Sequence, residues 1–326
     1  YYMDYRNFIK SRNLRIKILS FLDWIPDSIM LRLQYWIQTG RRLHINQAQR
    51  YTEKIQVYKM KYRNPDMLRC TDKYEVRGYV EEKGLGEYLI PLIGIYNNVE
   101  DIDFKSLPQQ FVVKTTDGSG GNQVILCKDK NELKEDAFYE RLNSWMSMPK
   151  TKNPGREWAY ENGFPRRILI EKLIGENKEE EVPDFKFFCF DGEPLFLYVS
   201  DNLNNELVFL DLDWKPLPFV RTDFKKMNPI PPKPKSLNTM IEVAKKLSAN
   251  YPHVRVDLYS VEEKVYFGEL TFYTSSGYIQ FNPDSADFDI GGLFHLEGNG
   301  GGKFYLIISN VSRRKTLSQV EYRVAI

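Results

Sequence analysis

The sequence predicts an α+β protein, and three observations support this class. Strand-like runs pair into antiparallel hairpins, the clearest of which turns on Asp191-Gly192, a dipeptide that favours a two-residue turn. Amphipathic helices stand between these hairpins without a regular βαβ order. Apolar residues make up 42% of the 326 residues, which is typical of a globular protein.

Charge and cysteine content exclude several classes of protein. The net charge is only +2, so no overall basic field favours nucleic acid as a partner. The three cysteines are scattered and form no CxxC pair, which argues against a disulfide framework or a zinc site and favours a reducing cytoplasm. The apolar run 16–31 is interrupted by Lys17, Asp23 and Asp27, so it is too short and too polar to span a bilayer.

Two basic amphipathic helices are expected at the start of the chain, at 6–22 and 27–39. Residues 1–64 carry 13 Lys and Arg against 4 Asp and Glu, so this segment has a charge of +9 and the remainder −7. We favour an interpretation in which the apolar faces of both helices pack on the body of the protein. The alternative is peripheral contact with an anionic membrane surface through Arg12, Arg15, Lys17, Arg41 and Arg42.

Helices and strands alternate through the middle of the chain. A helix at 71–83 is expected to begin at Thr71 or Asp72 and to end at Gly84. Runs of β-formers predict strands, and a segment with two prolines and two glycines predicts a loop. The elements expected are a strand at 89–96, a hairpin at 111–127, a helix at 131–148, a loop at 150–165 and a strand at 167–174.

Hairpins dominate the second half of the chain. The expected strands are 186–190, 194–200, 207–212, 254–261 and 265–273. A proline-rich connector at 228–235 leads into a helix at 236–250 that Ser236 is expected to cap. The glycine-rich stretch 291–303 predicts a flexible linker before a divergent basic tail.

The hairpin at 111–127 holds the first candidate site, because Lys114 precedes a tract with Gly118, Gly120 and Gly121 and a strand follows. A Walker A loop opens a helix and places its lysine after the glycines, and a dinucleotide loop also opens a helix. A protein kinase needs an HRD motif, and no histidine here is followed by Arg-Asp. Backbone N–H groups of a hairpin loop can still cradle a triphosphate; the alternative is an ordinary glycine-rich turn.

The last predicted hairpin holds the second candidate site. If residues 262–264 form a three-residue turn, Asp257 lies opposite Glu269 and Arg255 opposite Thr271, all on one face. Opposed carboxylates repel each other, and a divalent cation such as Mg²⁺ would reverse that effect. The alternative is that both carboxylates are solvated or paired with basic side chains. Together the two hairpins resemble the parts needed for phosphoryl transfer without a protein nucleophile.

Taken in order, these motifs resemble the TupA-like (teichuronopeptide biosynthesis) family of ATP-grasp enzymes. The matching segments are TEKIQVYKM at 52–60, TDKYEVRGYV at 71–80, FVVKTTDGSGGNQVILCKDK at 111–130, VPDFKFFCFDGEP at 182–194, VRVDLY at 254–259 and YFGELTFYTSSGY at 266–278. The resemblance covers residues 30–294 and implies an ATP-grasp fold, in which two α+β lobes hold ATP between them. The expected units are a helical segment at 1–64, a lobe with the glycine loop at 65–170, a lobe with the metal hairpin at 171–294, and a tail at 295–326.

The resemblance also implies a set of site residues and two cofactors, ATP and Mg²⁺. The residues expected to bind ATP are Lys73, Lys114, Gly118, Ser119, Gly120, Gly121, Asn122, Glu171, Lys172, Ile174 and Lys186. Asp257 and Glu269 resemble the metal ligands, and Thr271 stands where the wider superfamily usually has Asn, a departure that would weaken the third ligand. Arg255 and Lys114 are expected to stabilise charge on the transferred phosphoryl group.

The expected activity is ATP-dependent carboxylate–amine ligation, in which a substrate carboxylate is phosphorylated and an amine then displaces phosphate. The resemblance implies that an amino acid or small amine joins a uronic acid during capsular or cell-surface polysaccharide synthesis, in the cytoplasm or at the inner face of the membrane. Three alternatives remain open. They are a sugar kinase with Asp184 or Asp201 as base, a glycosyltransferase, and a non-catalytic nucleotide-binding or scaffold protein of glycan assembly.

Overall fold

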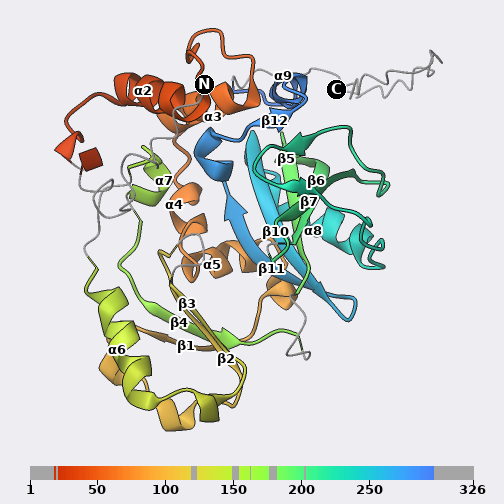
Figure 1. Cartoon of the computed structure of the whole chain (residues 1–326). Helices are drawn as coiled ribbons and strands as arrows, with labels where there is room; N and C mark the ends of the chain where they lie inside the picture. The colour runs from red at the N-terminus through yellow and green to blue at the C-terminus, as the bar shows by residue number, and fades with distance from the viewer. Residues whose placement is uncertain are drawn as a thin grey trace, which may run out of the picture.

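The computed structural model describes residues 18–19, 21–118, 123–148, 154–161, 163–175, 182–201 and 203–296. Within them, helices surround two separate, mainly antiparallel sheets (Figure 1), which confirms the α+β class. The helices are α2 (Asp27–Thr39), α3 (Tyr51–Lys61), α4 (Asp66–Cys70), α5 (Glu75–Glu82), α6 (Glu135–Met146), α7 (Trp158–Glu161), α8 (Leu237–Ser248) and α9 (Ser285–Gly292). Among the described residues, every helix is too short or too polar to traverse a bilayer.

The smaller sheet has four strands in the order β1-β4-β2-β3, and every neighbouring pair is antiparallel. Its strands are β1 (Leu92–Tyr96), β2 (Phe111–Thr115), β3 (Val124–Cys127) and β4 (Ile168–Lys172). Helix α6 contributes Phe138 and Leu142 to a buried cluster with Phe111 and Val113 of β2. Because side chains alternate along a strand, Val112 and Lys114 of β2 lie on the opposite face.

The larger sheet has six strands in the order β11-β10-β5-β6-β7-β9. Its strands are β5 (Asp184–Phe190), β6 (Glu193–Asp201), β7 (Glu206–Asp211), β9 (Lys225–Lys226), β10 (His253–Val261) and β11 (Lys264–Thr271). The predicted turn on Asp191-Gly192 joins β5 to β6, and both turn residues have positive φ, 49° and 82°. A short pair, β8 (Val220–Arg221) with β12 (Phe281–Asn282), forms a third sheet.

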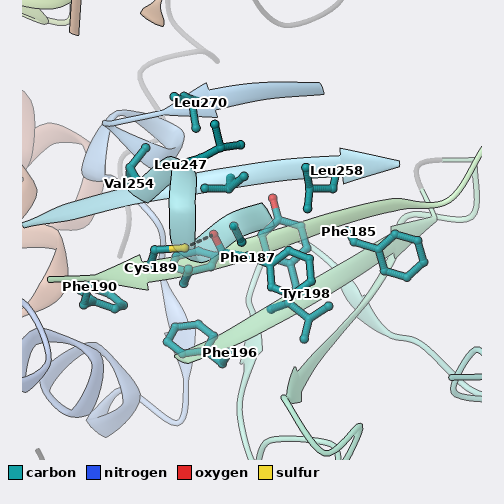
Figure 2. Close-up of a cluster of buried hydrophobic side chains, with 14 of the residues drawn as sticks. Phe185, Phe187, Cys189, Phe190, Phe196, Tyr198, Leu247, Val254, Leu258 and Leu270 are labelled. Atoms are coloured by element: carbon teal, nitrogen blue, oxygen red, sulfur yellow. Dashed lines mark hydrogen bonds between the residues drawn. The ribbon is translucent and has the colours of Figure 1, made fainter. Parts of the chain in front are cut away.

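Both faces of β5 and β10 are buried at the centre of the larger sheet. On one face, Phe187 and Cys189 pack with Val254 of β10 and Leu247 of α8 (Figure 2). On the other face, aromatic rings from β5 and β6 meet Tyr51 of α3. The second face therefore begins as an aromatic core and continues along the same strands to the charged residues described below.

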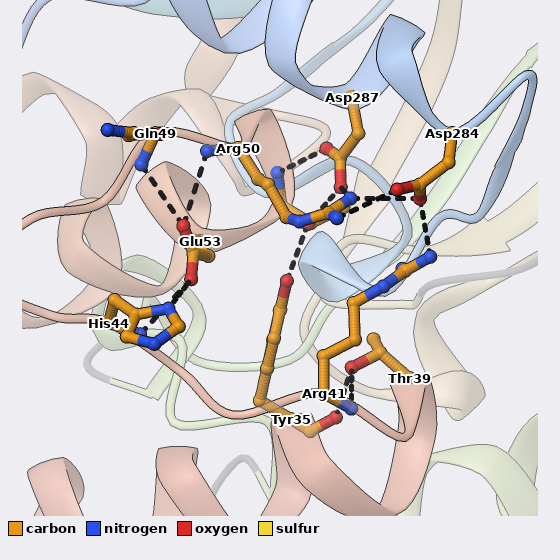
Figure 3. Close-up of polar contacts among 10 residues, drawn as sticks. Tyr35, Thr39, Arg41, His44, Gln49, Arg50, Glu53, Asp284 and Asp287 are labelled. Carbon is orange, nitrogen blue, oxygen red and sulfur yellow. Dashed lines mark hydrogen bonds and ion pairs between the residues drawn. The ribbon is translucent and has the colours of Figure 1, made fainter.

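A polar network fastens the start of α3 to α9 (Figure 3). Arg50 donates to both carboxylate oxygens of Asp284 at 2.9 and 2.7 Å. Buried Asp287 accepts from the backbone N–H of Thr52 at 3.0 Å. Glu53 accepts from the backbone N–H groups of the two residues before α3, at 3.0 and 3.3 Å, and so caps the helix. These contacts join the N-terminal helices to the C-terminal end of the described chain.

Four helices differ from the sequence-based expectation. Helices α3 and α4 were not predicted, α7 lies within the loop expected at 150–165, and α9 enters the stretch that predicted a flexible linker. Gly291 lies so close to the start of α3 that a Cβ atom there would stand 2.0 Å from the carbonyl oxygen of Gln49, and Phe294 is fully buried. The linker prediction is therefore wrong for residues 291–296, while the rest of that stretch and most of the helix expected at 6–22 lie outside the described residues.

The cores of the protein also group the helices differently from the predicted units. Residues of α4 and α5, including Met67 and Tyr79, belong to the same buried cluster as the six-stranded sheet. The predicted grouping placed them with the four-stranded sheet, within 65–170. Asp72 caps α5 as predicted, because its carboxylate accepts from the backbone N–H groups of Tyr74 and Glu75.

Candidate active site

The β10–β11 hairpin pairs its charged residues as the sequence predicted, but with a different turn and a β-bulge. Asp257 is the partner of Glu269 and Arg255 the partner of Thr271. The predicted three-residue turn is wrong, because Val261 pairs with Lys264 and only two residues with positive φ form the turn. An irregularity between Asp257 and the next residue shifts the register by one, which restores the predicted partners.

The register shift depends on Gly268, which has no partner in the ladder. A Cβ atom at this position would stand 2.9 Å from the carbonyl oxygen of Asp257 and 3.0 Å from the ring of Tyr259. Both distances are shorter than ordinary carbon contacts. A β-bulge with a glycine at the crowded position thus aims Glu269 and Thr271 at β10.

The guanidinium of Arg255 lies at the centre of this hairpin face. It donates to both oxygens of Asp257 at 2.7 and 2.6 Å, and its second terminal nitrogen also reaches Thr271 Oγ1 at 3.0 Å and Glu269 Oε1 at 3.5 Å. The alternative interpretation, a carboxylate paired with a basic side chain, therefore holds for Asp257. The Asp257 side chain is only 3% exposed, whereas that of Glu269 is 54% exposed.

Lys186 of β5 approaches the same carboxylate from the other side. Its Cα partner across the ladder is Asp257, and its Nζ lies 3.5 Å from Asp257 Oδ2 and also contacts Asp184. Burial lowers the pKa of Lys186, and Asp257 partly offsets the effect. For Asp257, burial alone would raise the pKa, but Arg255 and Lys186 outweigh burial and hold it below its usual value. Asp257 is therefore held in its charged form.

The four-stranded sheet presents a second group of predicted residues. Lys114 forms an ion pair with buried Glu171, and Lys73 donates to the carbonyl oxygen of Gly118. Ile174 lies just beyond β4 and is partly buried. Lys172 is exposed and follows Glu171 directly, so it lies on the opposite face of β4 and the structure does not bring it to the other predicted residues.

The two groups lie close enough to influence each other's charge. Burial lowers the pKa of Lys73, and the charge of Glu269 opposes that shift. Burial raises the pKa of Tyr259 of β10, and the charges of Glu269, Asp257 and Glu171 raise it further. Charged groups from both hairpins thus act on the same side chains.

The glycine loop itself is only partly visible. Ser119, Gly120, Gly121 and Asn122 lie outside the described residues, so their predicted role is untested. Gly118 is described, and a Cβ atom there would stand 2.6 Å from Thr115 Oγ1. Glycine is thus needed where the chain leaves β2.

Sequence reasoning missed two arginines, of which one supports this loop and the other binds the start of α5. Arg166 donates to both oxygens of Asp117 at 2.9 Å, directly before Gly118. Arg167 pairs with Asp72 at 3.2 Å and with Glu75 at 2.8 Å, at the start of α5. The signal available in the sequence was an Arg-Arg pair immediately before the β4 strand.

The predicted metal ligands converge on one point. Oxygens of Asp257, Glu269 and Thr271 all lie within 3.5 Å of the same terminal nitrogen of Arg255. Among the described residues, no group of three His, Cys, Asp or Glu side chains is arranged to hold a metal. Two carboxylates and a hydroxyl are a donor set that suits Mg²⁺, because this ion typically takes one or two carboxylates and completes its shell with water and substrate phosphates.

Thiol and imidazole chemistry is not available at this site. Burial raises the pKa of Cys70 and of Cys189 to about 12 and also raises that of Cys127, so the thiols are not activated as nucleophiles. Burial lowers the pKa of His253 to about 3, and this ring lies in the aromatic core against Tyr51 and Phe190.

Comparisons with known proteins identify the family of this chain. The sequence matches the family described as TupA-like ATPgrasp over residues 53–295, whereas a search of curated proteins found no match. Among solved structures, the chain is similar to D-alanine–D-alanine ligases from Bacillus anthracis (17% identity, TM-score 0.40, covering 62% of this chain and 57% of that one) and Helicobacter pylori (18%, 0.38, 68% and 59%). It is also similar to an L-amino acid ligase from Bacillus licheniformis (13%, 0.42, 77% and 55%). The chain thus spans less than two thirds of the length of these structures.

Proposed function

Because this chain belongs to the TupA-like ATP-grasp family, we propose that it is an ATP-dependent carboxylate–amine ligase. Its substrates would be a sugar carboxylate, such as a uronic acid, and an amino acid or small amine, joined during synthesis of a surface polysaccharide. A phosphoryl group passes from ATP to the carboxylate, and the amine then displaces phosphate to form an amide. The observation that carries the proposal is the cluster of Arg255, Lys186, Asp257 and Glu269 facing Lys73 and Lys114.

The lysines and the β10–β11 hairpin would have different roles. Lys114 of β2 and Lys73, which precedes α5, would meet phosphate oxygens, because lysine serves as a point charge for phosphate. Asp257 and Glu269, with Thr271, would hold Mg²⁺, which neutralises phosphate charge when bound. Arg255 would then turn from Asp257 towards the transferred group and stabilise the charge that spreads over its oxygens.

The contacts favour a ligase over a sugar kinase. A kinase acting on a hydroxyl needs a carboxylate positioned as base, and Asp184 and Asp201 were the candidates. Asp184 is ion-paired with Lys186, and Asp201 accepts from the backbone and side chain of Asn204 at 3.0 and 2.7 Å. A carboxylate acceptor needs no such base, because it is already ionised at neutral pH.

The test is an ATP-to-ADP assay over a panel of uronic acids and amines. We expect phosphate release only when a carboxylate and an amine are both present. A stable phosphorylated sugar formed without amine would establish a kinase. Binding of a nucleotide sugar without binding of ATP would support a glycosyltransferase, and unchanged cellular glycan in an Asp257→Asn strain would support a scaffold.

The glycine loop provides a second test of the same site. Replacing Gly120 and Gly121 by valine should sharply reduce ATP turnover and leave the urea unfolding midpoint close to that of the wild type. Gly78→Ala in α5 is a matched control, because a Cβ atom there meets nothing within 4 Å. If turnover survives the double substitution, the loop does not cover the triphosphate.

A further inference from the structure

The N-terminal end of the described chain exposes large apolar side chains at unusual density. Six of the fourteen exposed large hydrophobic side chains in the described residues fall between residues 18 and 36. They are Ile18, Phe21, Trp24, Ile29, Leu33 and Trp36. Phe21 is 80% exposed, Trp24 76% and Trp36 56%. Scattered apolar side chains are normal on a surface, but a concentration of this kind marks an interaction surface.

Helix α2 has apolar residues on two faces. Its inner face buries Met30, Leu31 and Tyr35, as expected if this segment packs on the body. Its outer face carries Ile29, Leu33 and Trp36, spaced by four and three residues and therefore aligned on the helix surface. All three are exposed. We call these three residues, together with Phe21 and Trp24, the outer apolar face.

The turn that carries Phe21 and Trp24 is held firmly in place. Arg156 donates to the carbonyl oxygens of Leu22, Asp23 and Ile25 at 2.8, 3.3 and 3.2 Å, and it pairs with Asp27 at 3.1 Å. One partly buried arginine thus satisfies several backbone acceptors at the turn. The same contact neutralises Asp27, an acidic side chain beside the outer apolar face.

Two exposed arginines lie on α2 and shortly after its end. Arg32 and Arg42 are exposed, and Arg32 donates to the backbone carbonyl oxygen of Ser28 on its own helix. By sequence, residues 1–17 add five cations and only one acid. Exposed aromatics beside Lys and Arg are the composition of segments that lie in the interfacial region of a membrane.

We propose that the outer apolar face docks on an anionic lipid bilayer, with the aromatic side chains at the headgroup boundary and the arginines against lipid phosphates. A second copy of the chain fits less well. In a two-fold dimer the same patch faces itself, so the arginines of one copy would meet an equally basic patch on the other and repel it. The proposal needs no catalytic activity and stands apart from the ligase assignment.

The test is flotation of the full-length protein with phosphatidylcholine vesicles, with and without phosphatidylglycerol. The wild type should float with the anionic vesicles, float poorly with neutral ones, and lose binding as salt rises, because screening weakens the charge term. The affinity of the variant Phe21→Ser/Trp24→Ser/Trp36→Ser for anionic vesicles should be at least roughly tenfold lower than that of the wild type. The pair Arg32→Glu/Arg42→Glu should lose the preference for anionic vesicles.

The matched control is Leu126→Ser/Phe164→Ser/Leu203→Ser, which removes three exposed apolar side chains elsewhere and should bind as the wild type does. Urea unfolding of all variants checks that the fold is retained. Absence of wild-type flotation with anionic vesicles overturns the proposal, as does equal binding by the aromatic variant. If the wild type does not bind vesicles but sediments as a dimer, and the aromatic variant sediments as a monomer, the face is assigned to a second copy instead.

Discussion

The Arg255–Asp257 pair allows a sharp test, because the chain contains a second pair with the same spacing and a different environment. Arg221 donates to both oxygens of Asp223 at 2.9 and 2.6 Å, much as Arg255 does to Asp257. The acidic side chain is 57% exposed in the Arg221 pair and 3% exposed in the Arg255 pair. Replacing each arginine by methionine removes the charge and keeps most of the apolar stem.

The two substitutions should differ severalfold in their effect on stability. Removing one partner of a buried ion pair costs about 3–5 kcal/mol, since the remaining charge is left buried. Lys186 stays 3.5 Å from Asp257, so we expect the lower end of that range for Arg255→Met. The exposed pair should contribute about 1 kcal/mol or less. With a urea dependence near 3 kcal/mol per molar, the Arg255→Met midpoint should fall by about 1 M.

The loss of stability in Arg255→Met should also depend on pH in a definite direction. In the wild type the pKa of Asp257 is lowered, so the pair stabilises the fold above the unfolded carboxyl pKa of about 3.9, and this contribution is lost as pH falls through the folded value. Without the guanidinium, burial dominates and the pKa of Asp257 rises. The deficit of Arg255→Met should therefore be largest at neutral pH and should narrow as acid protonates Asp257.

Urea unfolding of the wild type and both variants at several pH values between 4 and 7.5 measures these effects. Equal losses for the two variants would show that burial of Asp257 does not decide the outcome. A deficit that grows in acid would show that the carboxyl is not held ionised by Arg255. Either result would refute the assignment of Arg255 as the internal counter-ion of this site.

Three further predictions concern single positions. Gly268→Val should cost about 1–3 kcal/mol through overpacking against Asp257 and should abolish ATP turnover; urea unfolding and the ADP assay measure the two effects, and a fully active variant would contradict the bulge geometry. Lys114→Met should raise the dissociation constant for ATP on the order of tenfold, or about 1.4 kcal/mol, as measured by calorimetry; unchanged affinity would remove Lys114 from the site. His253 is neutral in the fold with a pKa of about 3, so the unfolded chain takes up a proton first and wild-type stability should fall from about pH 6.5 downward; His253→Gln should flatten that slope, and an unchanged slope would exclude this histidine as its cause.

Local patterns were sufficient to predict the hairpins, because alternation and turn chemistry act within a few residues. The same alternation could have shown that Lys172 leaves the site, since it follows Glu171 directly in a strand. Helix α3 was beyond such reasoning. Eight of its eleven residues, from Tyr51 to Lys59, are buried, and polar side chains such as Glu53 and Lys59 are among them. Burial in this helix therefore does not follow the apolar period from which a helix is predicted.

Other features depended on contacts between distant segments. Sequence placed Arg255 and Asp257 on one face, but whether the guanidinium binds a carboxylate or a phosphate depends on the three-dimensional environment. Gly291 belonged to a stretch that predicts a linker, and only its close approach to the start of α3 explains why it lies in a helix. Arg166 and Arg167 acquire their role from partners at Asp117 and Asp72, far away in the sequence.

The bulge at Gly268 and the two-residue turn of the same hairpin form a compensated pair of lengths. With this two-residue turn, a regular ladder that kept Gly268 as a paired residue would place it opposite Asp257 and would move Glu269 and Thr271 to the far side of the strand, because one step in a strand exchanges its faces. A three-residue turn without the bulge would give the same partners as the present hairpin. Related sequences should therefore keep these partners in either of two ways, with a short turn and a bulge or with a turn longer by one residue and a regular ladder.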